Sequence, residues 1–197
     1  TTPYTFVSTS SCVLNSYGLP VYVDIEPDTY NIDPDLIEDA ITKHTKAIIP
    51  VHFGGAIADI DKIREIADRH GLKVIEDAAQ AHGASLEEGR YAGSLGDLGI
   101  FSMQQSKLLT CGEGGIITTQ DDRLAELAWS LRHVGREPKG LWYEHFRLGW
   151  NYRMTELQAA ILLTQLAKME AQNATREKNV EYFFLSLIHI SEPTRPY

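Results

Sequence analysis

A strand, an amphipathic helix and a second strand follow one another closely in the first half of the chain. Residues 46–51 read KAIIPV, an apolar run of strand length. Residues 59–70 have apolar positions at helical spacing, and Gly71 follows as a stop signal. A further apolar run, 72–75, is typical of a buried strand. This order predicts a βαβ unit, and therefore an α/β protein with parallel strands.

Further along, two apolar runs flank a polar loop. Residues 98–103 and 115–119 have strand composition, and the loop between them contains one lysine, Lys107, within a glycine-containing stretch. A lysine amine is a nucleophile that forms a Schiff base when it is neutral, and burial near polar groups can lower its pKa enough. Lys107 could equally be an ordinary solvated loop lysine, as most lysines are.

The strand at 72–75 favours the chemical interpretation of the lysine. Glu76 and Asp77 lie at its carboxyl end, and Gln80 follows. Because ligands bind outside the carboxyl ends of strands in open α/β sheets, Asp77 and Lys107 can face one pocket. Pyridoxal phosphate (PLP) needs such a pair, a lysine for the imine and a carboxylate that keeps the pyridine nitrogen protonated. Asp77 could instead be a helix N-cap.

Two stretches carry a family resemblance: EDAAQAHGA at 76–84 and GSLGDLGIFSMQQSKLLTCGEGG at 93–115. Together they resemble the DegT/DnrJ/EryC1/StrS family of sugar aminotransferases, and the likeness runs from about residue 5 to about residue 184. The resemblance implies the large domain of a fold-type I PLP-dependent transferase. Such a domain is α/β, with three α/β/α layers around a mostly parallel sheet, and we expect it to be incomplete at both ends.

The resemblance also implies a role for each residue of the candidate cofactor site. Lys107 is the Schiff-base lysine, and Asp77 pairs with the pyridine nitrogen. Gln80 lies by the phenolic oxygen of the cofactor, and Ser102 contacts its phosphate. Phe6, within PYTFVST, matches the aromatic residue that stacks on the cofactor ring.

Asn151, within GWNYRM, matches an asparagine that reaches the phosphate of the neighbouring subunit's cofactor. It follows an irregular segment, 135–149, that is rich in aromatic residues. We therefore expect a homodimer with shared active sites, in which this segment lies at the interface.

The implied activity is transfer of an amino group from an amino acid, glutamine or glutamate, to a keto-sugar or keto-cyclitol. Lys107 then acts as general base and acid. The QQSK form of the lysine loop most resembles glutamine-dependent scyllo-inosose aminotransferases, and nucleotide-sugar aminotransferases are close competitors. Two other classes stay open: a dehydratase like aminohydroxybenzoate synthase, and a PLP-binding regulatory protein without turnover. Lys107 favours chemistry, because a dehydratase branch of the family carries histidine there.

Composition limits the other possible partners. The formal net charge is -9 without a basic run, which argues against nucleic acid and anionic membranes. No apolar run approaches the length of a membrane helix. The two cysteines, Cys12 and Cys111, indicate reduced thiols and a cytoplasmic protein. Neither they nor the histidines have metal-ligand spacing, so no metal site is expected.

We expect three regions along the chain. Residues 1–150 form the central part of a PLP-binding large domain, and 151–184 form a long helix that leads towards a C-terminal small domain. Residues 185–197 resemble translated adapter sequence and are taken as a non-native tail. We expect residues 1–197 on their own to retain cofactor weakly and not to turn over, since parts of the phosphate site and of the substrate pocket lie elsewhere.

Further local patterns concern single elements. Helices are expected at 12–17, 35–42, 121–133 and 155–183, the last with a break near Asn173, and a strand at 20–25. His52 is either a hydrogen-bonded core histidine or a pocket residue. His82 is either a substrate contact or a packed ring.

Overall fold

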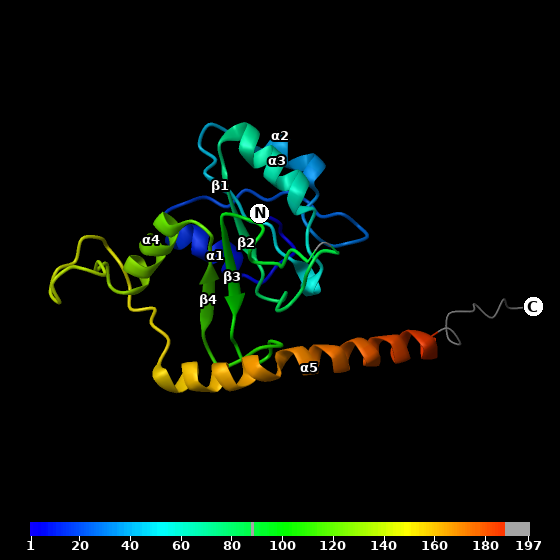
Figure 1. The fold of residues 1–197 in the computed structure, drawn as a ribbon. Helices are drawn as coiled ribbons and strands as arrows, with labels where there is room; N and C mark the ends of the chain where they lie inside the picture. The colour runs from blue at the N-terminus through cyan, green and yellow to red at the C-terminus, as the bar shows by residue number, and fades with distance from the viewer. Residues whose placement is uncertain (88, 188–197) are drawn as a thin grey trace, which may run out of the picture.

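Four strands form one open sheet in the computed structural model, which describes residues 1–87 and 89–187. Across the sheet the order is β1 (Ala47–Ile48), β2 (Lys73–Asp77), β3 (Leu98–Ser102) and β4 (Gly115–Thr118) (Figure 1). The first three strands are parallel, and β4 runs antiparallel to β3. The expected α/β class with a mostly parallel sheet is confirmed.

The helical elements are α1 (Ser8–Asn15), η1 (Pro34–Leu36), α2 (Ile37–Ala40), η2 (Phe53–Gly55), α3 (Ile60–His70), α4 (Asp122–Arg132) and α5 (Glu156–Leu187). The expected helices at 59–70 and 121–133 are confirmed. Asp59 and Asp121 cap their first turns by accepting backbone N–H groups, and Gly71 ends α3 in the left-handed conformation with φ 64°.

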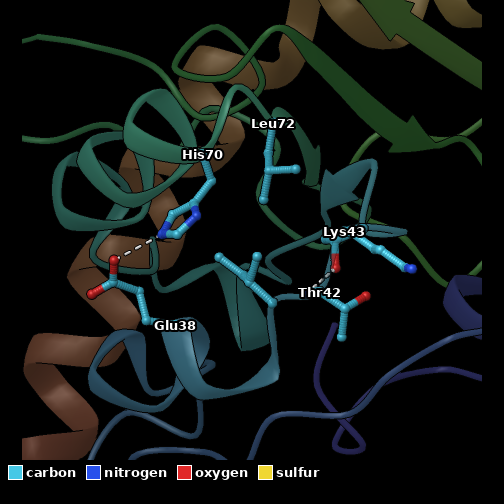
Figure 2. A pocket seen from close by; sticks show the side chains of 7 residues that line it. Glu38, Thr42, Lys43, His70 and Leu72 are labelled. Carbon is cyan, nitrogen blue, oxygen red and sulfur yellow. Dashed lines mark hydrogen bonds and ion pairs between the residues drawn. The ribbon is translucent and has the colours of Figure 1, made fainter.

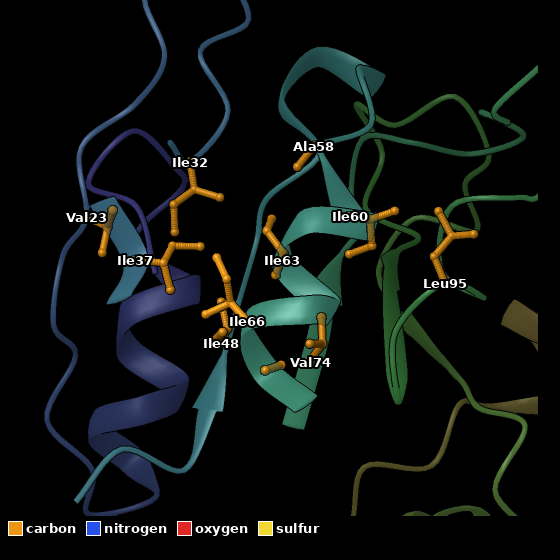
Figure 3. Close-up of a cluster of buried hydrophobic side chains, with 11 residues drawn as sticks. Val23, Ile32, Ile37, Ile48, Ala58, Ile60, Ile63, Ile66, Val74 and Leu95 are labelled. Carbon is orange, nitrogen blue, oxygen red and sulfur yellow. The ribbon is translucent and has the colours of Figure 1, made fainter. Parts of the chain in front are cut away.

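The main core lies between α3 and the strands it crosses. Ile63 and Ile66 of α3 pack with Ile48 of β1 and Val74 of β2, and all four are at most 4% exposed (Figure 3). Complete burial of a side chain of this size contributes about 1.5–3 kcal/mol. This packing fixes the β1–α3–β2 unit that the apolar spacing predicts.

Neighbouring side chains of β2 point to opposite faces of the sheet. Val74 and Glu76 share the face that α3 covers, whereas Asp77 faces α1 on the other side (Figure 1). The consecutive acids Glu76 and Asp77 therefore serve different environments.

Glu76 is fully buried and its carboxylate is saturated with donors. Oε1 accepts the backbone N–H groups of Leu95 (2.7 Å) and Gly96 (2.6 Å), and Oε2 accepts that of Gly93 (2.8 Å). His52 completes the set through Nε2, 2.8 Å from Oε2. Burial raises the pKa of Glu76, but the hydrogen bonds from His52, Gly96 and Gly93 outweigh it and hold that pKa below its usual range.

His52 is thus a hydrogen-bonded core histidine. The N–H of Ala58 donates to Nδ1 (3.2 Å), which leaves Nε2 as the protonated nitrogen that faces Glu76. The ring has no exposed surface, so His52 does not line a pocket.

The helix α5 crosses the carboxyl end of β3 (Figure 1). Leu162 of α5 packs with Met103, Leu109 and Cys111, which belong to the segment between β3 and β4. Gln158 Nε2 also donates to the carbonyl of Glu113 (2.7 Å). The loop that contains Lys107 is therefore held against the first half of α5.

Several expected boundaries differ from the structure. The helix α5 has no break at Asn173 and continues to Leu187, because no Gly or Pro interrupts it. Of the expected tail, 188–197 lies outside the described residues. The expected helix at 35–42 is only the short pair η1 and α2, and the helix expected at 12–17 is α1, which begins and ends earlier.

The strand expected at 20–25 is wrong. The backbone there bonds to Thr1, through Val23 N–H to the Thr1 carbonyl (2.8 Å) and the Thr1 amine to the Val21 carbonyl (3.0 Å). Ile25 forms only an isolated bridge to Ile32. Two short contacts do not make a ladder, so the alternating pattern instead places Val23 in the core as extended chain.

Two other observations apply to the described residues. Cys12 and Cys111 are both free thiols, as expected. Within 1–87 and 89–187, every helix is too short or too polar to cross a lipid bilayer.

Replacing Glu76 by Gln should lower the free energy of unfolding by about 3 kcal/mol or more, because an amide NH2 would face N–H donors in a dry interior. The pKa of Glu76 is lower in the folded protein than in the unfolded chain, so its contribution is present above the ordinary pKa of a glutamate and is lost as the pH falls through the folded-state pKa. Urea unfolding between pH 7 and pH 3 measures both effects.

The matched control is Glu65→Gln, which alters an exposed acid on α3. We expect it to change stability by less than about 0.5 kcal/mol. Equal losses from the two substitutions would contradict the structural role given to Glu76.

Candidate active site

The carboxyl end of β2 places Asp77. Its N–H donates to the Pro50 carbonyl (2.8 Å), and its carbonyl accepts the His52 N–H (3.0 Å). The next residues form a turn and not a helix, so the N-cap interpretation of Asp77 does not hold. The backbone of Asp77 is instead fixed by the neighbouring strand segment, at the sheet edge where α/β proteins bind ligands.

The Asp77 side chain is 9% exposed and receives two hydrogen bonds. Oδ2 accepts the Thr9 hydroxyl (2.7 Å), and Oδ1 accepts the Ala79 N–H at 3.2 Å. Each carboxylate oxygen can accept a second bond, so Asp77 keeps acceptor capacity for a ligand. The negative charge of Asp77 also affects Cys12 of α1. Burial raises the pKa of the Cys12 thiol, and the charge of Asp77 raises it further, whereas backbone hydrogen bonds oppose the rise.

Phe6 lies just before α1, close to the residues that bind Asp77. Its carbonyl accepts the N–H of Thr9 (3.1 Å), so one turn of chain connects Phe6 with the hydroxyl on Asp77. The Phe6 ring is 73% exposed, which leaves its faces open to a planar ligand.

Gln80 follows Asp77 in the turn after β2. Its Oε1 accepts the N–H of Gly54 (2.8 Å), which has φ 60°. A Cβ at Gly55 would lie 3.2 Å from the Gln80 carbonyl. The glycines of η2 thus allow that backbone to approach the turn and to orient the Gln80 amide.

Ser102 ends β3, next to β2. Asp77 pairs with Ile100 in the parallel register, so Ser102 projects from the same sheet face as Asp77. The Ser102 hydroxyl accepts the N–H of Gln104 (3.3 Å), and its carbonyl is 2.8 Å from Nε2 of His82. The structure thus brings Ser102 and Asp77 to one edge and one face of the sheet.

His82 connects the turn after β2 with the end of β3. Its ring is 5% exposed and packs on Phe101, with 5.5 Å between ring centroids. Nδ1 has no hydrogen-bond partner among the described residues. Burial lowers the pKa of His82, as does the nearby charge of Lys107, while the Ser102 hydrogen bond opposes them. His82 is therefore a neutral packed ring that donates to Ser102, rather than an exposed contact.

Lys107 lies in a turn closed by its own N–H and the Gln104 carbonyl (2.9 Å), and it is half-buried. Its charge contributes to the lowered pKa of His82, whose Nε2 faces the Ser102 carbonyl at the end of β3. In the same loop a Cβ at Gly114 would lie 3.0 Å from Met154 and 3.2 Å from the Cys111 sulfur. A side chain at Gly114 would crowd the packing that holds this loop to the segment before α5.

Asn151 lies apart from the other candidates. It forms a bridge with His133 at the end of α4, and its Oδ1 accepts the Arg153 Nε (2.7 Å). No hydrogen bond within 1–87 and 89–187 connects Asn151 with Asp77, Ser102 or Lys107. Its expected role in a neighbouring subunit stays a prediction.

A separate pocket lies between α2 and the end of α3 and contains none of the candidates. It is lined by Glu38, Ile41, Thr42, Lys43, Thr45, His70 and Leu72 (Figure 2). His70 Nε2 lies 2.9 Å from Glu38 Oε1 there. Since Leu72 directly precedes β2, this pocket is at the amino end of the strand, opposite to Asp77. We assign no function to it.

Thr9 and the donors around Glu76 were not predicted from the sequence. Thr9 precedes Asp77 by 68 residues, so no local pattern connects them. The run of small residues around Gly93 and Gly96 was a signal for a backbone that closes over a buried group.

Comparisons with known proteins agree with the resemblance. The putative L-glutamine:3-amino-2,3-dideoxy-scyllo-inosose aminotransferase of Streptoalloteichus tenebrarius is 44% identical over 193 residues, 96% of this chain and 46% of that protein. An aminotransferase structure from Psychrobacter cryohalolentis superposes with a TM-score of 0.88 at 38% identity, covering 95% of this chain and 50% of that one.

A third relative concerns the cofactor. A Bacillus subtilis protein solved with bound PMP, the aminated form of PLP, has a TM-score of 0.74 at 40% identity and covers 84% of this chain and 36% of that one. The chain thus spans about half the length of the first two relatives, or less. The model of the DegT/DnrJ/EryC1/StrS aminotransferase family, whose members are PLP-dependent, matches residues 1–194, and the chain belongs to this family.

Proposed function

We propose that the protein carrying this chain is a PLP-dependent aminotransferase that moves an amino group from glutamine or glutamate to a keto-cyclitol or keto-sugar. The observation that carries the proposal is the shared placement of Asp77 and Ser102 on one sheet face, with the Lys107 loop at the end of the same strand pair. The Streptoalloteichus tenebrarius relative, whose name gives glutamine as donor and an inosose as acceptor, supports glutamine and a cyclitol as the substrates.

The residues present fit PLP by their chemistry. Asp77 has free acceptor capacity for a protonated ring nitrogen, and Phe6 offers an exposed ring for stacking. Ser102 offers a hydroxyl for the phosphate, and Gln80 an amide already oriented by Gly54. When bound, PLP supplies a carbonyl for the amine and a ring that withdraws electrons from the donor's α-carbon.

Lys107 would hold the cofactor through its amine and would serve as the base, and then the acid, that moves the proton of the donor α-carbon. Its loop is packed on α5, so its position depends on α5 as well as on β3. Ser102 and, from a partner subunit, Asn151 would hold the phosphate. Asp77 would keep the ring nitrogen protonated.

The function is tested with glutamine labelled with 15N at its α-amino group and a keto-cyclitol acceptor. The protein expressed from its complete reading frame should yield the 15N-aminocyclitol and the keto acid in equal amounts. A parallel reaction with a nucleotide-linked keto-sugar identifies the better acceptor. Water elimination without 15N transfer would indicate the dehydratase alternative, and cofactor binding without any product from either acceptor would indicate a regulatory protein.

Lys107→Ala should abolish the yellow, borohydride-reducible PLP adduct, because the substitution removes the only amine assigned to the covalent link. Absorbance at the cofactor band and the mass of the reduced protein measure this loss. Lys43→Ala, at an exposed lysine near the amino end of β2 and opposite to Asp77, is the matched control and should keep the full adduct. An equal yield of adduct from the two variants would refute the assignment of Lys107.

Mixed dimers test the shared site. If Asn151 serves the partner's cofactor, a Lys107→Ala chain paired with an Asn151→Ala chain contains one site with both residues intact. Up to about half of the wild-type activity per dimer should return, whereas each parent homodimer should be strongly impaired. Purified heterodimers that are no more active than the parents would mean that the two residues serve the same subunit's site.

A further inference from the structure

The hydroxyl of Thr9 is buried against the Asp77 carboxylate. Thr9 is 4% exposed, and its Oγ1 lies 2.7 Å from Asp77 Oδ2. Behind it, Thr5 Oγ1 lies 2.8 Å from Thr9 Oγ1. A carboxylate only accepts, so the single Thr9 hydroxyl proton goes to Asp77, and Thr5 must donate to Thr9. Thr5, Thr9 and Asp77 therefore form a chain of hydrogen bonds with one direction.

We propose that Thr9 is a positioning residue that sets the orientation of the Asp77 carboxylate for the ring nitrogen of PLP. This inference rests on the proposed function. The Thr9 hydroxyl occupies one acceptor position on Oδ2, and the Ala79 N–H occupies one on Oδ1. With both oxygens held, the carboxylate cannot rotate freely, and its remaining lone pairs keep a fixed direction.

Hydrogen bonds within α1 and the residues before it fix the position of Thr9, and therefore the geometry of its hydrogen bond to Asp77. Thr9 lies in the first turn of α1, and its N–H donates to the Phe6 carbonyl (3.1 Å). The Cys12 thiol donates to the Thr9 carbonyl (3.2 Å). The segment that carries the Phe6 ring therefore also fixes the Thr9 hydroxyl that donates to Asp77. The proposed stacking of Phe6 and the proposed contact of Asp77 with the ring nitrogen thus depend on the same segment.

The test compares Thr9→Val with Thr9→Ser in the protein expressed from its complete reading frame. Valine keeps the shape of threonine but removes the donor, whereas serine keeps the donor. We expect Thr9→Val to weaken PLP binding to the apoprotein roughly tenfold, as for loss of one hydrogen bond to a charged group. The absorbance band of bound PLP should also titrate at a shifted pH, and Thr9→Ser should restore both properties to within about twofold.

Thr119→Val is the matched control. The Thr119 hydroxyl donates to the Asp97 carbonyl (2.6 Å), next to the amino end of β3 and away from Asp77. This substitution removes a comparable hydrogen bond, so it should affect thermal unfolding of the apoprotein but not PLP affinity or the absorbance titration. If Thr9→Val does not fold, Thr9→Ala replaces it, since alanine removes the donor without a methyl group against Oδ2.

Binding and titration that are the same in the Thr9 donor-less variant and in Thr119→Val would overturn the inference while leaving the proposed function intact. A wild-type protein that neither binds PLP nor forms the Lys107 adduct would instead overturn the proposed function, and this inference with it.

Discussion

The buried Glu76 carboxylate is the interaction on which the rest of the structure depends. It gathers three backbone N–H groups from the 93–96 segment and the imidazole of His52, so that β2, the residues after β1 and the approach to β3 converge on one side chain. An ionised group without exposed surface is stable only when its acceptors are filled, and here each oxygen has two donors. Because Asp77 directly follows Glu76, the hydrogen bonds of Glu76 also fix the end of β2 that carries Asp77.

Side chains alternate between the two faces along β2, so two consecutive acids can have different roles. Glu76 has a structural role, and Asp77 is available to a ligand. Glu76 faces the α3 side, where saturation by donors leaves it no capacity for a ligand. Asp77 faces α1, where Thr9 and Ala79 leave lone pairs available. A close approach supports this arrangement: a Cβ at Gly99, which pairs with Glu76, would overlap the backbone of Gly93. The absence of a side chain at Gly99 lets the 93–96 segment reach the Glu76 carboxylate.

The sequence predicted elements whose signals are local. The stripe of isoleucines in α3 and the Gly71 stop placed that helix almost to the residue, and the apolar runs around Lys107 placed β3 and β4. Predictions were wrong where contacts between residues distant in sequence determine the local structure. Residues 20–25 alternate like a strand, yet their backbone bonds to Thr1 and Asp33 and forms just an isolated bridge to Ile32, without a strand ladder. The helix expected from Pro34 onward is short because the chain extends again at Ile41.

The residues of the candidate site were predictable from the sequence, but the hydrogen bonds that connect them were not. Motif resemblance named Asp77, Gln80, Ser102 and Lys107, and the parallel register puts Asp77 and Ser102 on one face of the sheet. Nothing local could show that Thr9 would supply the Asp77 donor, since a contact across 68 residues exists only after folding. His52 and His82 had two interpretations each, and burial decided both. The His52 ring has both nitrogens in internal hydrogen bonds. The His82 ring is packed on Phe101 and donates through Nε2 to the Ser102 carbonyl.

The central claim is that the Glu76-anchored end of β2 and the α5-anchored loop after β3 present Asp77 and Lys107 to one cofactor. A crystal structure of the complete protein, after reduction with borohydride in the presence of PLP, tests it most directly. We predict a phosphopyridoxyl group bonded to Lys107 Nζ, with an Asp77 carboxylate oxygen within hydrogen-bond distance of its ring nitrogen. A group attached to another lysine, or a ring nitrogen that faces away from Asp77, would contradict the account.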